Sequence, residues 1–570
     1  MSNRCQDFVT CTTGADSQQE LAHSFCRALD ALVAVDVVRS SRANLLAAVS
    51  GHYRHRVLDS LWQRPTARML GAWGAEGAAT RVMATAQRNI LNHLVRELAP
   101  LPVGQRFGLD RLRDAGEPAK HFRHSVPATS YADVADLIER VAQNEADVLF
   151  PGRALALAQT SGTTRHDGAG ERLIPQSQRL LRHHASGGLA AFRRAMLAGG
   201  PRVATGRFLM LGGSTTLSTN TAGVPVGDLS GICATRLPRL LQRRWEPGLS
   251  IALEDDWRRK IERIAERCGP RDVRAVAGVP SWCLVLFAAV CAGRGTTRVS
   301  DAWRHLGVLV YGGHAVEPFL PALRQHLAPS TQMLEVYAAS EAFLAVGARA
   351  WALARQRPAS LELLWDCGVY LEFVPDGGRA DEAVGPHEIE AGQVYVPLVT
   401  TPGGLVRYEI GDRVLGVGPG LIRFAGRTRT HLSVFGEHVE GYALAAALEH
   451  ACSLTGATVT AYHVAPRFPT SQDPRGAHEW WVEFGRQPHD CAVFASAIDA
   501  YLCEHVLDYA AHRRGDAQLL ASSVVVLPAG TIENYLSRQG RLGGQHKMPQ
   551  AWPDRSVADE LAHSAGEVKT

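Results

Sequence analysis

Residues 156–164, Ala-Leu-Ala-Gln-Thr-Ser-Gly-Thr-Thr, run from an apolar strand pattern directly into a loop of hydroxyl residues and glycine. Small residues let the backbone approach an anion, and successive amide N–H groups and hydroxyls provide hydrogen-bond donors. The loop is not a Walker motif, because the chain contains no Gly-Lys pair. An ordinary Ser/Thr turn would look the same in isolation. A phosphate-binding role therefore needs support from other segments.

A second segment, residues 334–341, reads Leu-Glu-Val-Tyr-Ala-Ala-Ser-Glu, a strand-like run that ends in an aromatic ring, a hydroxyl and a carboxylate. Tyr337 is suited to stack on a purine, Ser340 to reach an α-phosphate, and Glu341 to help hold Mg²⁺. A buried tyrosine followed by a helix-capping Ser-Glu pair is the alternative. Beside a phosphate loop, the segment predicts a site for a nucleotide and its metal.

The third and fourth elements lie nearer the C-terminus. Residues 400–412 end on a glycine turn at Asp412, whose carboxylate can accept hydrogen bonds from both ribose hydroxyls. Arg427 closes the following Phe-Ala-Gly-Arg segment and can complement phosphate. Lys547 lies in the glycine-rich run Gly-Gly-Gln-His-Lys-Met-Pro. Arginine is the default cation of this chain, so a lysine on such a loop favours a chemical role.

The order of apolar runs predicts an α/β fold. Residues 20–100 have helical spacing, which indicates a helical N-terminal region. Beyond residue 150, helical stretches alternate with strand-like runs, at 154–158, 207–211, 306–311, 333–337, 368–374 and 393–400. Within residues 405–424 a hairpin is expected, with a glycine triplet at its turn rather than a dinucleotide fingerprint.

After Arg427 the pattern changes to a smaller mixed α/β segment, with strands near 458–464 and 480–484 and a helix near 491–507. We therefore predict a large N-terminal domain over residues 1–427 and a smaller domain over residues 428–570. The final stretch, 551–570, is polar and is expected to be a loose tail.

Composition narrows the function. The 570-residue chain is 46% hydrophobic and has a formal net charge of only +4, which predicts neither nucleic acid nor an acidic membrane as a partner. Its 11 cysteines form no CxxC pair, so buried thiols are expected rather than zinc sites or disulfides. No apolar run is long enough to cross a bilayer, and the first residues lack a signal-peptide pattern. A cytoplasmic enzyme of small-molecule chemistry is the expectation.

In this order and spacing the elements resemble the adenylate-forming superfamily. More closely, they are similar to the Gretchen Hagen family of acyl-acid amido synthetases, the auxin-responsive plant enzymes and their bacterial relatives, and a bacterial-type member is expected. The resemblance covers roughly residues 150–550. It also includes Thr-Ala-Gly-Val-Pro-Val-Gly at 221–227, Gly-Val-Pro-Ser-Trp at 278–282 and Tyr-Gly-Gly at 311–313.

The resemblance implies a mobile C-terminal domain and a two-step reaction with ATP and Mg²⁺. A carboxylic acid is first adenylated with release of pyrophosphate, and an amine, typically of an amino acid, then displaces AMP. By position, the resemblance implies that Ser161, Gly162, Thr163 and Thr164 bind the β- and γ-phosphates and that Ser340 binds the α-phosphate. It implies that Tyr337 binds the adenine, Asp412 the ribose and Glu341 the metal. Arg427 has an implied hinge role, and Lys547 would stabilise the transition state. Glu341, Arg427 and Lys547 form the implied catalytic set.

Two departures from the family pattern concern the nucleotide. The phosphate loop continues through residues 165–175 with acidic residues where the family places glycine and lysine, and Arg172 is the candidate to replace a lysine. Ala339 stands where a hydroxyl residue is common, which removes one donor. An acyl pocket is expected near Val224 and Trp282, lined by apolar groups that suit a hydrophobic or aromatic acid.

Two other functions share these motifs. A ligase that passes the acyl group to a thiol, coenzyme A or a carrier protein, would perform the same first step, and family resemblance alone favours the amine. A catalytically silent nucleotide-binding fold is the second alternative, against which the retention of Glu341, Asp412, Arg427 and Lys547 argues. Histidine pairs such as His121 and His124 are expected to be surface residues rather than metal ligands. Neither the acid nor the amine is specified by these patterns.

Overall fold

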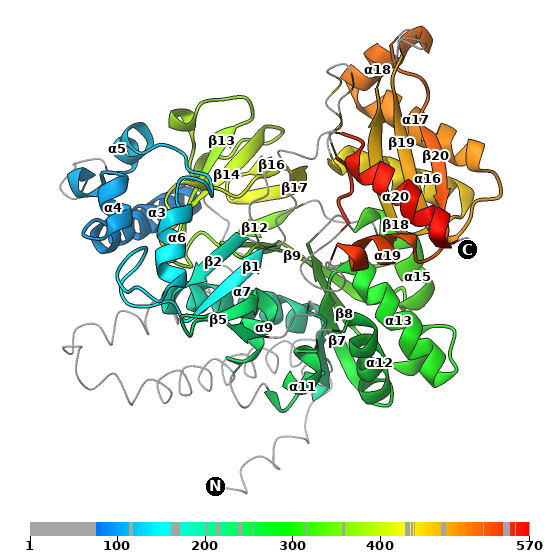
Figure 1. The fold of residues 1–570 in the computed structure, drawn as a ribbon, viewed down its shortest axis with the longest axis horizontal. Coiled ribbons are helices and arrows are strands. Elements are labelled where there is room, and N and C mark those ends of the chain that lie inside the picture. Colours follow the sequence, from blue (N-terminus) through cyan, green and yellow to red (C-terminus); the bar gives the residue numbers. More distant parts are fainter. Residues whose placement is uncertain are drawn as a thin grey trace, which may run out of the picture.

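A computed structural model describes the following residues: 76–112, 118–160, 172–200, 203, 205–212, 217–237, 242–254, 256–313, 316–355, 360–427, 432, 434, 437, 439, 441–468, 475–516, 518–539, 548–552 and 554–568. They form two units, each built around its own sheets (Figure 1). The large unit comprises the described residues from 76 to 427, and the small unit those from 432 to 568, since Leu432 and Val439 belong to its core.

The largest sheet is parallel in one half. Its strands β6 (Trp245–Glu246), β3 (Arg207–Met210), β7 (Val273–Gly278), β8 (Val308–Gly312) and β9 (Gln332–Ala338) lie side by side in that order. Alternate residues of β8 enter different cores, because successive side chains of a strand point to opposite faces. Val308 and Val310 pack on helix α7 (Gln178–Gly199), whereas Leu309 packs on the helix layer of the other face. Burial on both faces explains why β8 is apolar throughout.

The other half of this sheet is antiparallel. Beyond β9 follow, in spatial order, β10 (Phe343–Gly347), β12 (Leu361–Leu363), β17 (Leu421–Arg427), β16 (Asp412–Gly418), β14 (Val394–Thr400) and β13 (Tyr370–Pro375). The expected glycine hairpin is confirmed as the β16–β17 connection. Gly418 and Gly420 there have φ angles of 148° and 72°, which glycine adopts without a Cβ penalty.

A second, four-stranded sheet carries the strand that leads into the predicted phosphate loop. Its order is β2 (Arg172–Gln176), β1 (Ala156–Thr160), β5 (Pro225–Asp228) and β4 (Ser218–Thr219), with β1 parallel to β5. Helix α3 (Glu76–Leu98) contributes to the same apolar core as β1. It confirms the C-terminal part of the expected helical region, whereas residues 20–75 lie outside the described part.

The remaining elements of the large unit are short strands and helices. They are α4 (Pro102–Arg106), η1 (Leu109–Leu112), α5 (Pro118–Ser125), α6 (Ala135–Ala142), α9 (Leu229–Ala234), α11 (Leu249–Ala252), α12 (Trp257–Cys268), α13 (Pro280–Arg294), α14 (Val299–Ala302), η2 (Glu317–Phe319), α15 (Leu320–His326), β11 (Trp351–Ala352), η3 (Ala380–Glu382), η4 (Pro386–Glu388) and β15 (Tyr408–Glu409). Helices α12, α13 and α15 form the helix layer opposite α7.

The small unit is a three-stranded sheet covered by helices on both faces. Strands β18 (Thr458–Arg467), β19 (Ala477–Arg486) and β20 (Ser523–Leu527) lie in that order. Helices α16 (Gly441–Thr455) and α17 (Cys491–His505) pack on one face, and α19 (Thr531–Arg538) and α20 (Ser556–Val568) on the other. The connection after α17 holds α18 (Leu507–Arg513) and η5 (Arg514–Asp516). Both strands and the helix expected here are confirmed.

The expectation of a loose tail over 551–570 is wrong for its described residues. Helix α20 buries Val557, Ala558 and Leu561 against Trp481 and other residues of β19, β20 and α19. The helix contains few large apolar residues, but they recur at helical spacing and therefore form one apolar face. The segment before it is also ordered, because Ala551 pairs with Val464 of β18.

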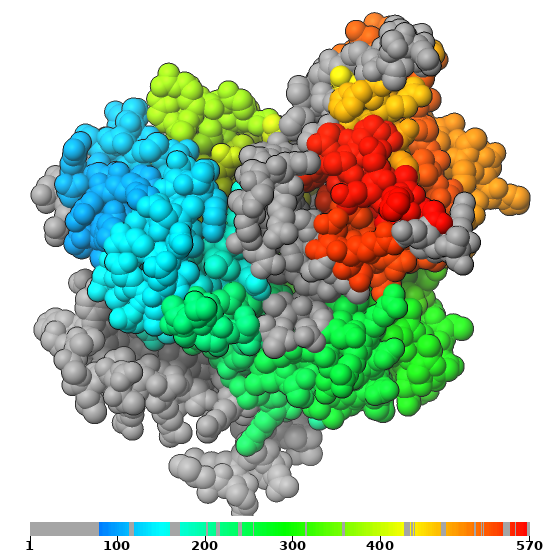
Figure 2. Space-filling view, in the orientation of Figure 1, coloured from blue at the N-terminus to red at the C-terminus, as the bar shows by residue number. Residues whose placement is uncertain are grey.

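The two units contact each other along one side of the large sheet. Helix α16 and strand β18 contact η2 and α15. In Figure 2 the orange and red surface of the small unit meets the green surface of the large unit. Arg258 and Glu533 form an exposed ion pair across this contact, with Nε and Oε1 2.7 Å apart. Exposed pairs of this kind contribute little stability. The domain boundary at residue 427 adjoins positions outside the described part and stays a prediction.

No described helix is long and apolar enough to span a bilayer. The described cysteines carry free thiols, and burial raises the pKa of Cys283 to about 12. Buried thiols of this kind are inert at neutral pH. The expectation of buried thiols is confirmed for Cys268, Cys283, Cys291 and Cys452, whereas Cys233, Cys367, Cys491 and Cys503 are only partly buried.

Candidate active site

The predicted motifs lie where parallel strands end. Strand β7 ends at Gly278, β8 at Gly312 and β9 at Ala338, so the Gly-Val-Pro, Tyr-Gly-Gly and Tyr-Ala-Ala-Ser-Glu segments share the carboxyl edge of the parallel strands. Ligands of open α/β sheets bind outside this edge. The motifs, which the sequence places tens of residues apart, are therefore gathered at one location.

Tyr337 and Asp412 are in direct contact. The Tyr337 hydroxyl donates a hydrogen bond of 2.6 Å to Oδ2 of Asp412, and both side chains are buried. Three strands separate β9 from β16 in the sheet order, so a flat sheet would hold them about 19 Å apart at about 4.8 Å per strand. The sheet must therefore curl strongly between them. This curl brings the residues predicted for adenine and ribose together.

Phe424 and Arg427 extend the same group on strand β17. The rings of Tyr337 and Phe424 meet edge to face, with centroids 5.6 Å apart. Asp412 at the start of β16 lies directly opposite Arg427 at the end of β17. The backbone thus places Arg427 beside the predicted ribose ligand, while its side chain lies outside the described part.

Ser340 and Glu341 lie on a turn immediately after β9. The amide of Ala339 donates to the carbonyl of Ala342 at 2.9 Å, which closes this turn. Ser340 is buried, whereas Glu341 is partly exposed. Burial, together with the negative charge of Glu341, raises the pKa of Tyr408 above its ordinary value.

A magnesium ion fits this turn. Mg²⁺ takes oxygen ligands and is usually held by one or two carboxylates together with substrate phosphates. The half-exposed Glu341 carboxylate offers such a ligand next to the Ser340 position. Among the described residues, no three His, Cys, Asp or Glu side chains converge on a cage for a metal. Metal binding at Glu341 stays a prediction.

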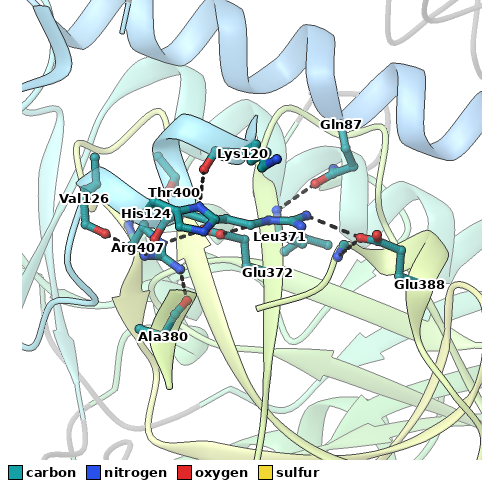
Figure 3. A network of polar contacts seen from close by, with 12 residues as sticks. Gln87, Lys120, His124, Val126, Leu371, Glu372, Ala380, Glu388, Thr400 and Arg407 are labelled. Atoms are coloured by element: carbon teal, nitrogen blue, oxygen red, sulfur yellow. Dashed lines mark hydrogen bonds and ion pairs between the residues drawn. The ribbon is translucent and has the colours of Figure 1, made fainter. Parts of the chain in front are cut away.

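Arg407 of the Gly-Leu-Val-Arg-Tyr-Glu-Ile-Gly-Asp motif has a structural role that the sequence did not reveal (Figure 3). Its Nε donates to Oε2 of Glu372 at 3.0 Å, and both side chains are fully buried. The other guanidinium nitrogens donate to the carbonyls of Arg123, Val126 and Ala380, at 2.5 to 2.9 Å. Arg407 thus ties α5, η3 and β13 together.

The two predicted acyl-pocket residues belong to different apolar clusters. Val224 is buried with the N-terminal helices, and its amide donates to Oδ1 of Asn220 at 2.9 Å. Trp282 on α13 is half-buried and packs on Trp257, with ring centroids 5.2 Å apart. No described contact joins Val224 to Trp282, so a shared pocket stays a prediction.

Ser161, Gly162, Thr163, Thr164 and Lys547 lie outside the described residues. The chain that follows Lys547 is nevertheless anchored. His463 of β18 is fully buried, and its Nδ1 lies 2.8 Å from the carbonyl of Pro549. The amide of Val464 donates to the carbonyl of Gln550 at 2.9 Å. The described segment after the predicted lysine loop is therefore attached to the edge of the small sheet.

Three family models match the chain in succession. The GH3 family N-terminal domain matches residues 77–246, the central domain residues 362–427 and the C-terminal domain residues 442–556. Together these matches span more than half of the chain. The chain belongs to the GH3 family. The resemblance inferred from the motifs is thereby confirmed, whereas the expectation of a bacterial-type member stays a prediction.

Curated relatives of this GH3 chain include plant enzymes. Indole-3-acetic acid-amido synthetase GH3.8 of Oryza sativa subsp. indica is 26% identical over 274 residues, which cover 45% of this chain and 44% of the relative. Indole-3-acetic acid-amido synthetase GH3.4 of Arabidopsis thaliana is 23% identical over 45% of each chain. The matches thus span less than half the length of these relatives.

Two solved structures show the fold. The acyl acid amido synthetase AtGH3.15 in complex with 2,4-DB has a TM-score of 0.67 at 16% identity, over 86% of this chain and 96% of that one. A 2-hydroxyisobutyryl-CoA ligase in its postadenylation state has a TM-score of 0.51 at 14% identity, over 86% and 93%. The predicted α/β fold, that of the adenylate-forming enzymes with a smaller C-terminal part, is confirmed.

Proposed function

We propose that this protein is an ATP-dependent acid–amine ligase that adenylates a small carboxylic acid and transfers the acyl group to a small amine, such as a free amino acid. The contact between Tyr337 and Asp412, at the strand edge that also carries Ser340 and Glu341, is the observation that carries the proposal. It joins residues suited to adenine, ribose, α-phosphate and metal within one site of a GH3 chain. We also propose that the protein acts in the cytoplasm.

The first step joins the acid to AMP. A carboxylate oxygen attacks the α-phosphorus of ATP, the bond from that phosphorus to the bridging oxygen breaks, and pyrophosphate leaves. Tyr337 and Asp412 are proposed to hold the nucleoside, which their direct contact supports, and Ser340 is proposed to bind the α-phosphate. Magnesium at Glu341 would supply positive charge to the phosphate oxygens. Arg427 and Lys547 are proposed to stabilise the charge that grows on the α-phosphate.

The second step forms the amide. The amine nitrogen attacks the acyl carbon, the bond from that carbon to the phosphate oxygen breaks, AMP leaves and the nitrogen loses a proton. The Ser161–Thr164 loop is proposed to hold the β- and γ-phosphates before this step.

Val224 and Trp282 are proposed to line an apolar acyl pocket, which suits a hydrophobic or aromatic acid. An acid library in which only short polar acids react would contradict this pocket.

The test is pyrophosphate release from ATP and Mg²⁺ with pooled carboxylic acids, with and without pooled amino acids, followed by mass spectrometry. Acid-dependent release with an amide product supports the ligase. Nucleotide binding without pyrophosphate release from any acid would instead support a silent fold. Because both substrates are supplied as pools, the mass of the product identifies the acid and the amine together.

A thiol acceptor is the second candidate, because the fold is shared with a 2-hydroxyisobutyryl-CoA ligase. The first step would be the same, so only the acceptor separates the two functions. Coenzyme A and an amino-acid pool offered together to the preformed acyl-adenylate would give a thioester or an amide. A thioester as the main product would overturn the proposed amine acceptor.

A further inference from the structure

The start of helix α7 contacts several segments of the candidate site. Gln176 ends strand β2, which follows the predicted phosphate loop, and Ser177 caps α7. Gln176 Nε2 donates to the carbonyl of Ser340 at 3.1 Å, and the Gln176 side chain is fully buried. Ser177 Oγ donates to the carbonyl of Pro402 at 2.7 Å. The strand that leaves the phosphate loop is thus bonded to the Ser340 turn.

His183, one and a half turns further along α7, holds the other end of that turn. Its Nε2 accepts the amide of Phe343 at 3.0 Å, and its Nδ1 lies 2.8 Å from the carbonyl of Cys367. A carbonyl only accepts, so Nδ1 carries the proton and Nε2 is the acceptor. Burial lowers the pKa of His183 to about 4, which keeps the ring neutral near pH 7. Both ring nitrogens are therefore used in the neutral form.

Close packing leaves this part of the helix little freedom. A Cβ built on Gly187 would clash with the ring of Phe343, so only glycine permits α7 to pass so near. His184, also buried, lies beside His183 with ring centroids 5.6 Å apart. Interiors packed to this density transmit small displacements rather than absorb them.

We propose that Gln176 and His183 are positioning residues that hold Ser340 and Glu341 in place relative to strand β2 and helix α7 during adenylation. The inference rests on the proposed function. Gln176 fixes the carbonyl at the start of the Ser340–Ala342 turn, and His183 fixes the amide that follows it. Neither side chain needs to touch the nucleotide. Their effect is geometric, because displacement of a reacting group by about 1 Å can cost about 100-fold in rate.

The two nitrogens of His183 allow a matched test. His183→Gln can keep an acceptor near the position of Nε2, and so the bond from Phe343. His183→Asn can keep a donor near the position of Nδ1, and so only the bond to Cys367. The inference predicts that His183→Asn and Gln176→Met lower the kcat of acid-dependent pyrophosphate release by about 10- to 100-fold, while the KM for ATP changes by less than about threefold. His183→Gln should retain most of the wild-type kcat.

Asp499→Asn serves as a stability control, because Asp499 is a buried acceptor in the small unit, away from the Ser340 turn. It should lower the unfolding midpoint while kcat is kept. Equal loss of kcat in His183→Asn and His183→Gln, or unchanged kcat in Gln176→Met, would overturn the positioning role. A wild-type protein that releases no pyrophosphate with any acid would instead overturn the proposed function, so the two failures are distinguishable.

Discussion

Replacement of Arg407 by methionine should destabilise the large unit severely without removing any group that touches the nucleotide. Methionine fills a similar volume but leaves the buried Glu372 carboxylate without its closest cation. Removal of one partner from a buried ion pair costs about 3–5 kcal/mol. The carbonyls of Arg123, Val126 and Ala380 also lose a donor, at about 1 kcal/mol each. We expect a total loss of at least about 5 kcal/mol.

Differential scanning calorimetry measures this loss. At about 2 °C per kcal/mol for a unit of this size, the midpoint of the large unit should fall by about 10 °C. The transition of the small unit is an internal control, because Arg407 contacts none of its described residues. The double variant Arg407→Met, Glu372→Gln should recover part of the midpoint, since it removes the unpaired charge.

Acidification provides a second signature. Burial already raises the pKa of Glu372, and loss of Arg407 should raise it further. Such a carboxyl has a higher pKa in the folded state than in the unfolded state. Its contribution to stability is fully present at pH values below the unfolded-state pKa, and it is lost as the pH rises through the folded-state pKa. The deficit of Arg407→Met relative to wild type should therefore shrink as the pH is lowered from about 7 to about 5. If Arg407→Met lowers the free energy of unfolding by less than about 1 kcal/mol, or by an amount that does not change with pH, the reasoning is refuted.

Three further predictions follow from the site and its supports. Lys547→Ala should lower acid-dependent pyrophosphate release by about two to three orders of magnitude, and an unchanged rate would exclude the lysine from catalysis. Asp412→Ala should mainly weaken ATP binding in a calorimetric titration, whereas unaltered affinity would contradict the ribose assignment. Burial lowers the pKa of His183, His184 and His463 to about 4, 3 and 4, so the unfolded chain binds protons that the folded state excludes. Stability should be complete above about pH 6.5 and fall towards pH 4 by about 1.4 kcal/mol per pH unit for each histidine. Chemical denaturation at a series of pH values measures this loss. As the pH falls, the free energy of unfolding of the control variant His463→Phe should decrease less steeply than that of wild type, and equal slopes would count against this account.

The fold was predictable where burial is reflected in a short apolar run. Strand β8 illustrates this, because packing on both faces makes its sequence apolar and a glycine ends it. Helix α20 was not predictable, since its few apolar residues become meaningful only against Trp481 and the other residues that they cover. Local patterns thus identified elements with a strong periodicity and missed one whose stability comes from tertiary packing.

The site was predictable residue by residue but not as a set of contacts. Tyr337 and Asp412 were assigned separate roles, yet the bond between them depends on the curl of a sheet whose strand order the sequence does not reveal. Arg407 lies within one of the predicted motifs, and only its burial distinguishes a structural cation from a phosphate ligand. Gln176 and His183 carried no clear signal, because polar residues follow Gln176 and flank His183 in the sequence.

The packing of α20 also affects the order in which the chain can fold during synthesis. Domains generally fold as units as they emerge from the ribosome, N-terminal regions first. The large unit can close once residue 427 has emerged, but one face of the small sheet is covered only by α19 until residues 556–568 follow. A nascent chain paused before that point exposes Trp481 and Trp552, an apolar surface of the kind that chaperones bind. Expression yield should therefore be unusually sensitive to truncation within α20.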